Sequence, residues 1–122
     1  MARHYKDLAA WQKSMNLVEL VYLATAVFPR HETYGLASQM RRAAVSVPSN
    51  IAEGQSRFSK RDFRHFLRAS RGSLAELETQ MLIARRLRYT DQALADTILS
   101  TNDEVSRILS GLISSISAQT DI

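Results

Sequence analysis

Apolar residues along this chain recur at alternating steps of three and four, the spacing that places side chains on one face of an α-helix. Four such segments follow one another, at about residues 7–28, 34–54, 59–89 and 90–117. Short polar stretches join the segments, and short connections place consecutive helices antiparallel. The pattern predicts an all-α fold, an antiparallel up-down-up-down four-helix bundle that forms one domain over residues 1–122.

The first segment carries two apolar stripes. The stripe with bundle spacing is predicted to face the core and comprises Leu8, Trp11, Met15, Val18, Tyr22 and Thr25. The stripe beside it comprises Leu17, Val21, Ala24 and Phe28. Because one apolar face suffices for a monomeric bundle, the second stripe predicts contact with a partner subunit. Pro29 cannot continue a helix and ends this one.

The second segment has a proline within its helical pattern. Its predicted inward residues are Leu36, Met40, Ala43, Val47 and Ile51. Pro48 removes one backbone donor, so we expect a kink over residues 44–47. Asn50 lies close enough to hydrogen-bond the carbonyl that the proline leaves free, which is a structural role. Gly54 starts the turn into the third segment.

The third and fourth segments begin at residues that favour the N-cap position. Ser59, with Asp62 three residues later, suits a capped helix start, and Thr90 with Asp91 forms a second cap. The inward residues of the third segment are predicted to be Phe63, Leu67, Ser70, Leu74, Leu77, Met81 and Ala84. Those of the fourth are predicted to be Leu94, Ile98, Thr101, Val105, Ile108, Leu112 and Ile116.

Antiparallel packing of the second and third segments places Arg41 and Arg42 roughly opposite Glu76. This placement predicts an ion pair across the two helices, and Gly72 would let their backbones approach. A further ion pair is predicted within the turn, between Glu53 and either Arg57 or Lys60. We favour a structural role for all of these residues.

The net charge of +4 is unevenly distributed. Residues 1–90 hold 15 lysine and arginine residues against 7 acidic ones, whereas residues 91–122 hold one arginine and five acids. The basic part can attract phosphate backbones, whereas the acidic part would be repelled by them and would face a different partner or solvent.

Arginines recur at steps of four and three along the third segment, on the side away from Phe63 and Leu67. This sector comprises Arg57, Arg61, Arg64, Arg68 and Arg71, with Arg41 and Arg42 as lesser candidates elsewhere. Guanidinium groups at this spacing can follow a phosphate backbone by charge and bidentate hydrogen bonds. The sector offers no Asn or Gln to read bases, so binding to RNA or DNA would not be sequence-specific. The simpler alternative is a solvated helix face.

Candidate chemistry for catalysis or metal binding is sparse. The chain has no cysteine, and its histidines, His4, His31 and His65, do not form a ligand pattern. We therefore expect no enzyme activity, no metal and no cofactor. The longest apolar stretch, residues 20–28, is too short to span a membrane, and no secretory signal is evident, so we expect a cytoplasmic protein.

Apolar residues beyond the arginines favour self-association. Ala75, Thr79 and Leu82 continue the arginine sector and, with the second stripe of the first segment, exceed what a monomer needs to bury. The alternative is packing against an N-terminal arm around Tyr5.

Two stretches closely resemble the bacterial four-helix-bundle proteins named for intervening sequences in 23S ribosomal RNA genes. They are YGLASQMRRAAVSVPSNIAEG (34–54) and FRHFLRASRGSLAELETQ (63–80), and the opening KDLAAWQKSMNLV (6–18) is similar as well. The resemblance covers about residues 5–115 and implies an antiparallel bundle that assembles as a homopentamer with a central opening. It carries over no catalytic residue.

A similar protein, the accessory variability determinant of diversity-generating retroelements, is a basic pentameric barrel that binds nucleic acid and a reverse transcriptase. The resemblance thus implies a homo-oligomer and possible partners among RNA, DNA, a reverse transcriptase or another protein. The hypothesis is a non-enzymatic pentameric module that binds RNA or DNA through the arginine sector. The alternative is a protein scaffold or adaptor that binds no nucleic acid.

Overall fold

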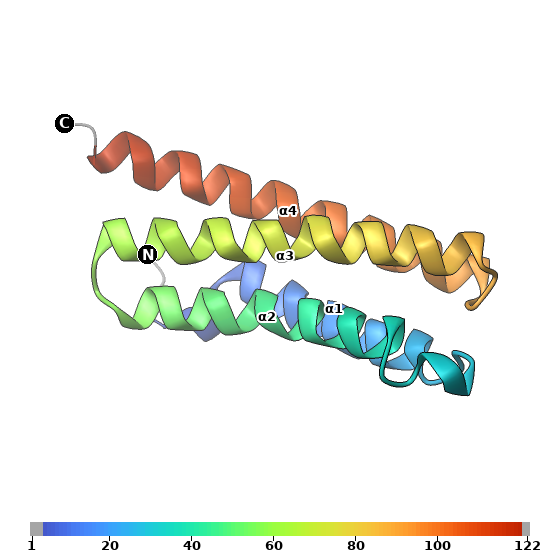
Figure 1. Ribbon diagram of the computed structural model, residues 1–122. Coiled ribbons are helices and arrows are strands. Elements are labelled where there is room, and N and C mark those ends of the chain that lie inside the picture. Colours follow the sequence, from blue (N-terminus) through green and yellow to red (C-terminus); the bar gives the residue numbers. More distant parts are fainter. Residues whose placement is uncertain (1–3, 121–122) are drawn as a thin grey trace.

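The computed structural model describes residues 4–120 and contains four long helices that pack as a bundle (Figure 1). The helices are α1 (Ala9–Thr25), α2 (Leu36–Ser56), α3 (Lys60–Arg86) and α4 (Gln92–Thr120), with 3₁₀ turns η1 (Tyr5–Asp7) and η2 (Arg30–Glu32). Each helix packs against two others: α2 against α1 and α3, and α4 against α3 and α1. Successive helices run in opposite directions in Figure 1, so the predicted four-helix bundle is confirmed.

The helix ends follow local chemistry. The Ser59 hydroxyl accepts the Asp62 N–H at 3.2 Å, and an Asp91 carboxylate oxygen accepts the Leu94 N–H at 3.2 Å, so both predicted caps are confirmed. At the end of α3, Arg88 takes a left-handed conformation with a φ of 60°. The Tyr89 N–H then reaches back to the Ala84 carbonyl at 3.0 Å, which closes the last turn of the helix.

The core of α1 lies on the stripe that the sequence assigned to a partner subunit. Leu17, Val21, Ala24 and Phe28 are buried, together with Ala10 and Ser14. Of the other stripe, Thr25 is buried and Leu8, Trp11 and Val18 are half-buried against the core, whereas Met15 and Tyr22 are 41% and 44% exposed. The prediction that this stripe forms the centre of the core, and that the second stripe contacts a partner subunit, was therefore wrong. Two adjacent stripes share the same spacing, and only the positions of α2 and α4 decide which of them is covered.

In α2 and α3 the predicted inward residues do form the core. All are buried except Leu36 and Phe63, which are half-buried and pack against it. In α4 the prediction holds at Ile98, Val105 and Ile116. The other predicted positions are wrong by one residue, because the second row of core residues lies on the opposite side of Ile98 and Val105, and Leu94, Ile108 and Leu112 are only half-buried at the edge of the core. The buried face of α4 comprises Ala95, Ile98, Asn102, Val105, Leu109, Ile113 and Ile116.

Pro48 is buried within α2, and the helix runs through it from Leu36 to Ser56. A proline at this position deprives the Ala44 carbonyl, four residues earlier, of its helical donor. The Asn50 amide instead donates to the carbonyl of Ser46 at 2.8 Å, so its predicted role was wrong. The expected kink over residues 44–47 stays a prediction.

α2 and α3 approach each other closely at Gly54. A Cβ added there would lie 2.7 Å from the Cβ of Phe66 and 3.2 Å from Cδ1 of Phe63. At Gly72, by contrast, an added Cβ would meet nothing within 4 Å, so its predicted role in close approach was wrong. A residue without a side chain is therefore required at Gly54, beside the α2–α3 turn, where Phe63 and Phe66 of α3 pack against α2.

A polar clip joins the α1–α2 connection to the segment between α3 and α4. Glu32 accepts the Leu36 N–H at 3.1 Å and the Tyr89 hydroxyl at 3.0 Å, and the Tyr89 ring packs on Phe28 with ring centres 5.4 Å apart. The hydrogen bond from Leu36, followed by that from Tyr89, lowers the pKa of Glu32 below its ordinary value. The same contact with Glu32 raises the pKa of the Tyr89 hydroxyl.

Gly54→Ala is expected to lower the free energy of unfolding by about 1 kcal/mol, because overpacking outweighs the gain in helix propensity. Gly72→Ala, into open space, should raise it by about 0.5–1 kcal/mol. Urea denaturation of the two variants measures both changes. A Gly54→Ala variant at least as stable as Gly72→Ala would contradict the close approach.

Glu32→Gln tests the polar clip with a side chain of the same shape. Glutamine has no charge and one acceptor oxygen, whereas the Glu32 carboxylate accepts the Leu36 N–H on one oxygen and the Tyr89 hydroxyl on the other. A lowered carboxyl pKa stabilises the fold above the ordinary value of 4.5, and that stability is lost as the pH falls through the folded-state value. The wild type should therefore unfold at a higher temperature than Glu32→Gln near pH 7, with the difference fading below pH 4.5. Glu78→Gln, at an exposed position on α3, is the control. A difference that does not change with pH would contradict this account.

Candidate nucleic-acid interface

Three arginines share the outward face of α3 in its first half. Arg61 and Arg68 are exposed and Arg64 is half-buried, while Leu67 and Ser70 are buried on the opposite side of the helix. No acidic residue occurs from position 63 to position 75. We call Arg61, Arg64 and Arg68 the α3 arginine face.

The two outer members of the predicted sector are held differently. Arg57 ends α2 and does not belong to α3; its Nε donates to Glu53 Oε2 at 2.9 Å, and its guanidinium lies 5.2 Å from the centre of the Phe66 ring. The predicted Glu53–Arg57 ion pair is confirmed, and it balances part of this charge. Arg71 donates from Nη1 to the Ser110 hydroxyl of α4 at 3.3 Å. The sector predicted from spacing is therefore divided between two elements, with Arg57 at the C-cap of α2 and the other four arginines on α3.

Arg41 turns toward α1 and away from α3. Its Nε donates to Thr25 Oγ1 at 2.8 Å, and its guanidinium lies 4.7 Å from the centre of the Tyr22 ring. Both arginines of α2 line an open hollow of about 710 Å³ between α1 and α2, with Tyr22, Tyr34, Ser38 and Val45 among its other walls. Arg41 thus belongs to a surface separate from the α3 arginine face.

Arg42 and Glu76 line a second hollow, between α2 and α3. Within residues 4–120, however, Glu76 forms no ion pair with either arginine of α2, so the predicted pair was wrong. Consecutive residues on a helix point about 100° apart. Arg41 therefore faces α1, and Arg42 alone remains on the side nearer α3.

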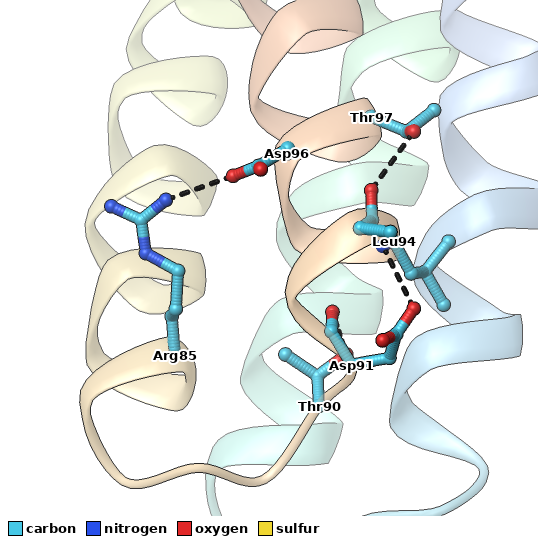
Figure 2. A network of polar contacts seen from close by, with 7 residues as sticks. Arg85, Thr90, Asp91, Leu94, Asp96 and Thr97 are labelled. Atoms are coloured by element: carbon cyan, nitrogen blue, oxygen red, sulfur yellow. Dashed lines mark hydrogen bonds and ion pairs between the residues drawn. The ribbon is translucent and has the colours of Figure 1, made fainter.

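Acidic residues of α4 neutralise basic residues away from the α3 arginine face. Figure 2 shows Arg85, near the end of α3, donating to Asp96 Oδ1 at 3.1 Å beside the Asp91 cap. Lys13 of α1 lies 3.1 Å from Glu104, and Arg107 lies 3.1 Å from Asp103. Among the described residues, Arg61 and Arg68 form no ion pair. Positive charge without an acidic partner thus remains at the end of α3 next to the α2–α3 turn.

The remaining candidate chemistry lies apart from this face. His31 is beside the Tyr89 ring, and His65 packs edge-on against Phe66. Across the described part of the chain, no three His, Asp or Glu side chains converge as metal ligands would. None of its helices has the length and apolar character needed to cross a membrane.

Residues 6–111 match the family of 23S rRNA-intervening sequence proteins. The chain belongs to this family. A crystal structure of a protein of unknown function from the S23 ribosomal protein family of Bacteroides thetaiotaomicron is similar, with a TM-score of 0.77 and 22% identity. That match covers 86% of this chain and 95% of the other and supports the fold. No curated protein matches the sequence.

One residue with a conspicuous position was missed by the sequence reasoning. Phe58, between Arg57 and the Ser59 cap, is 95% exposed and has a φ of 54°. The available signal was an aromatic residue inside an otherwise polar turn. Such a position usually carries glycine or asparagine when the backbone is left-handed.

Proposed function

We propose that this protein is a non-enzymatic, homo-oligomeric module that binds the phosphate backbone of RNA or DNA without sequence specificity. The observation that carries the proposal is the α3 arginine face, where Arg61, Arg64 and Arg68 follow one another over about 10 Å of helix axis. Like charges three and four residues apart destabilise an isolated helix slightly. Fold stability therefore gives no reason to gather them on one face.

The chemistry of this face suits phosphate. Guanidinium groups form bidentate, charge-assisted hydrogen bonds with phosphate oxygens and keep their charge at any physiological pH. The segment from 63 to 75 contains neither Asn nor Gln, the side chains that read adenine edges. Contacts of this kind position a nucleic acid without selecting its sequence.

Exposed apolar residues support self-association. Ala75, Thr79 and Leu82 form an exposed strip on α3, and Leu23 and Val27 of α1 are 62% and 71% exposed. Within the described residues, η1 packs on α1 and α2, where Tyr5 meets Trp11, and not on the α3 strip. In a ring joined head to tail, each subunit contacts its two neighbours through two different surfaces. The α3 strip and the exposed apolar residues of α1 can supply these two surfaces.

We take five as the number of copies, as the family resemblance implies. Five copies of a +4 chain would carry about +20, and repeated arginine faces would add avidity.

The second candidate is a protein-binding scaffold with no nucleic-acid partner. The hollow between α1 and α2 favours it, since exposed Tyr22, Tyr34 and Val45 give that surface an apolar component. This alternative predicts a protein partner that is retained after nuclease treatment, together with no salt-sensitive RNA or DNA binding.

Replacing Arg61, Arg64 and Arg68 together with glutamine is expected to weaken RNA binding strongly. Each lost phosphate contact lowers the slope of log K against log salt by about 0.7–0.9, so the triple variant should lose about 2–3 from that slope. Fluorescence anisotropy with a labelled RNA across a salt series measures both the affinity and the slope.

The matched control removes the same charge from exposed residues outside the α3 arginine face: Lys6→Gln, Arg30→Gln and Arg86→Gln. It should bind RNA with nearly the wild-type salt slope. Equal losses in the two triple variants would show that net charge alone governs binding and would overturn the proposed surface.

Leu82→Glu is expected to dissociate the oligomer, because it places a charge in the apolar strip of α3. Light scattering should give a multiple of 13.8 kDa for the wild type and a mass near 13.8 kDa for the variant. Met15→Glu changes a residue of similar exposure, 41% against 37%, outside both apolar surfaces, and should leave the oligomer intact. A wild-type mass of 13.8 kDa would contradict self-association.

A further inference from the structure

The α2–α3 turn presents an aromatic ring to water in an unfavourable way. Phe58 is 95% exposed, so its apolar surface gains nothing from burial. Its φ of 54° lies in the left-handed region, where a bulky side chain is an outlier. Strained residues that packing does not explain cluster at functional sites.

The turn is held firmly around this ring. The Phe58 N–H donates to the Gln55 carbonyl at 3.4 Å, and Ser59 caps α3 immediately afterwards. Gly54 brings α2 against Phe63 and Phe66 on the other side of the turn. Phe58 is therefore the left-handed residue between two fixed helix ends, and its ring points away from the core.

The two neighbouring phenylalanines are already engaged. Phe63 packs against the hydrophobic core, and Phe66 is covered by the Arg57 guanidinium. Within the described chain, the Phe58 ring stacks on no other aromatic ring. It is thus available to a ligand, with Lys60 and Arg61 exposed in the first turn of α3 beside it.

We propose that Phe58 stacks on an unpaired base of single-stranded RNA or DNA whose phosphates lie on the α3 arginine face. This inference rests on the function proposed above. A flat ring next to cationic side chains is the arrangement that holds single strands, because the ring takes a base while the cations follow the backbone. Stacking accepts every base, so the site is sequence-tolerant but discriminates single strands from duplexes, whose bases are already stacked.

Phe58→Gly tests the proposal without threatening the fold, since glycine adopts a left-handed φ freely. The variant should be at least as stable as the wild type. Its affinity for oligouridylate, a single strand with little stacking of its own, should fall about fivefold to a hundredfold. Its affinity for a blunt RNA duplex should change by less than about twofold, because phosphate contacts alone hold the duplex.

Phe58→Trp should bind single strands at least as tightly as the wild type, because the indole ring also stacks on a base. In a Trp11→Phe background, oligouridylate should quench the fluorescence of the indole at position 58. If Phe58→Gly binds oligouridylate as tightly as the wild type, the stacking role is wrong, but the proposed phosphate binding by the α3 arginine face is not affected. A wild type that binds neither probe overturns both proposals. An altered oligomer mass with unchanged binding assigns the ring to a subunit contact and also overturns the inference.

Discussion

The register of α3 between its two neighbours rests on two buried hydrogen bonds. The Ser70 hydroxyl donates to the Val47 carbonyl of α2 at 2.8 Å, and the Asn102 amide of α4 donates to the Leu74 carbonyl at 3.0 Å. Buried polar groups need partners, and losing one costs about 1–3 kcal/mol. A one-residue slip of α3 would turn its side chains by about 100° and break both bonds. The direction in which the α3 arginine face points is therefore a consequence of the core.

Charge is arranged along the bundle in a way that the core does not require. Acidic residues of α4 neutralise Lys13 and Arg85, whereas Arg61 and Arg68 have no carboxylate partner among the described residues. The tight approach at Gly54 fixes the α2–α3 turn beside this unneutralised charge. The strained, exposed Phe58 lies in that same turn, so the two features with the weakest structural justification are neighbours.

Much of the fold could be predicted from spacing, because caps and apolar periodicity are local properties. The inward face of α3 and the Glu53–Arg57 pair are examples. Spacing could not predict which of the two stripes of α1 is buried, since this depends on where α2 and α4 lie. The same limit applies to Gly72, because spacing along the chain could not show that no neighbouring helix comes within 4 Å of a Cβ added there. Spacing also gives no backbone dihedral angles, so it could not reveal the left-handed Phe58.

The α3 arginine face is proposed to contact the phosphate backbone directly. The most direct measurement is NMR of the arginine side-chain Nε–H signals during titration with RNA. The signals of Arg61, Arg64 and Arg68 should shift together and saturably, whereas that of Arg85, paired with Asp96, should stay in place. Shifts of equal size at all arginines, or at none, would contradict this proposal.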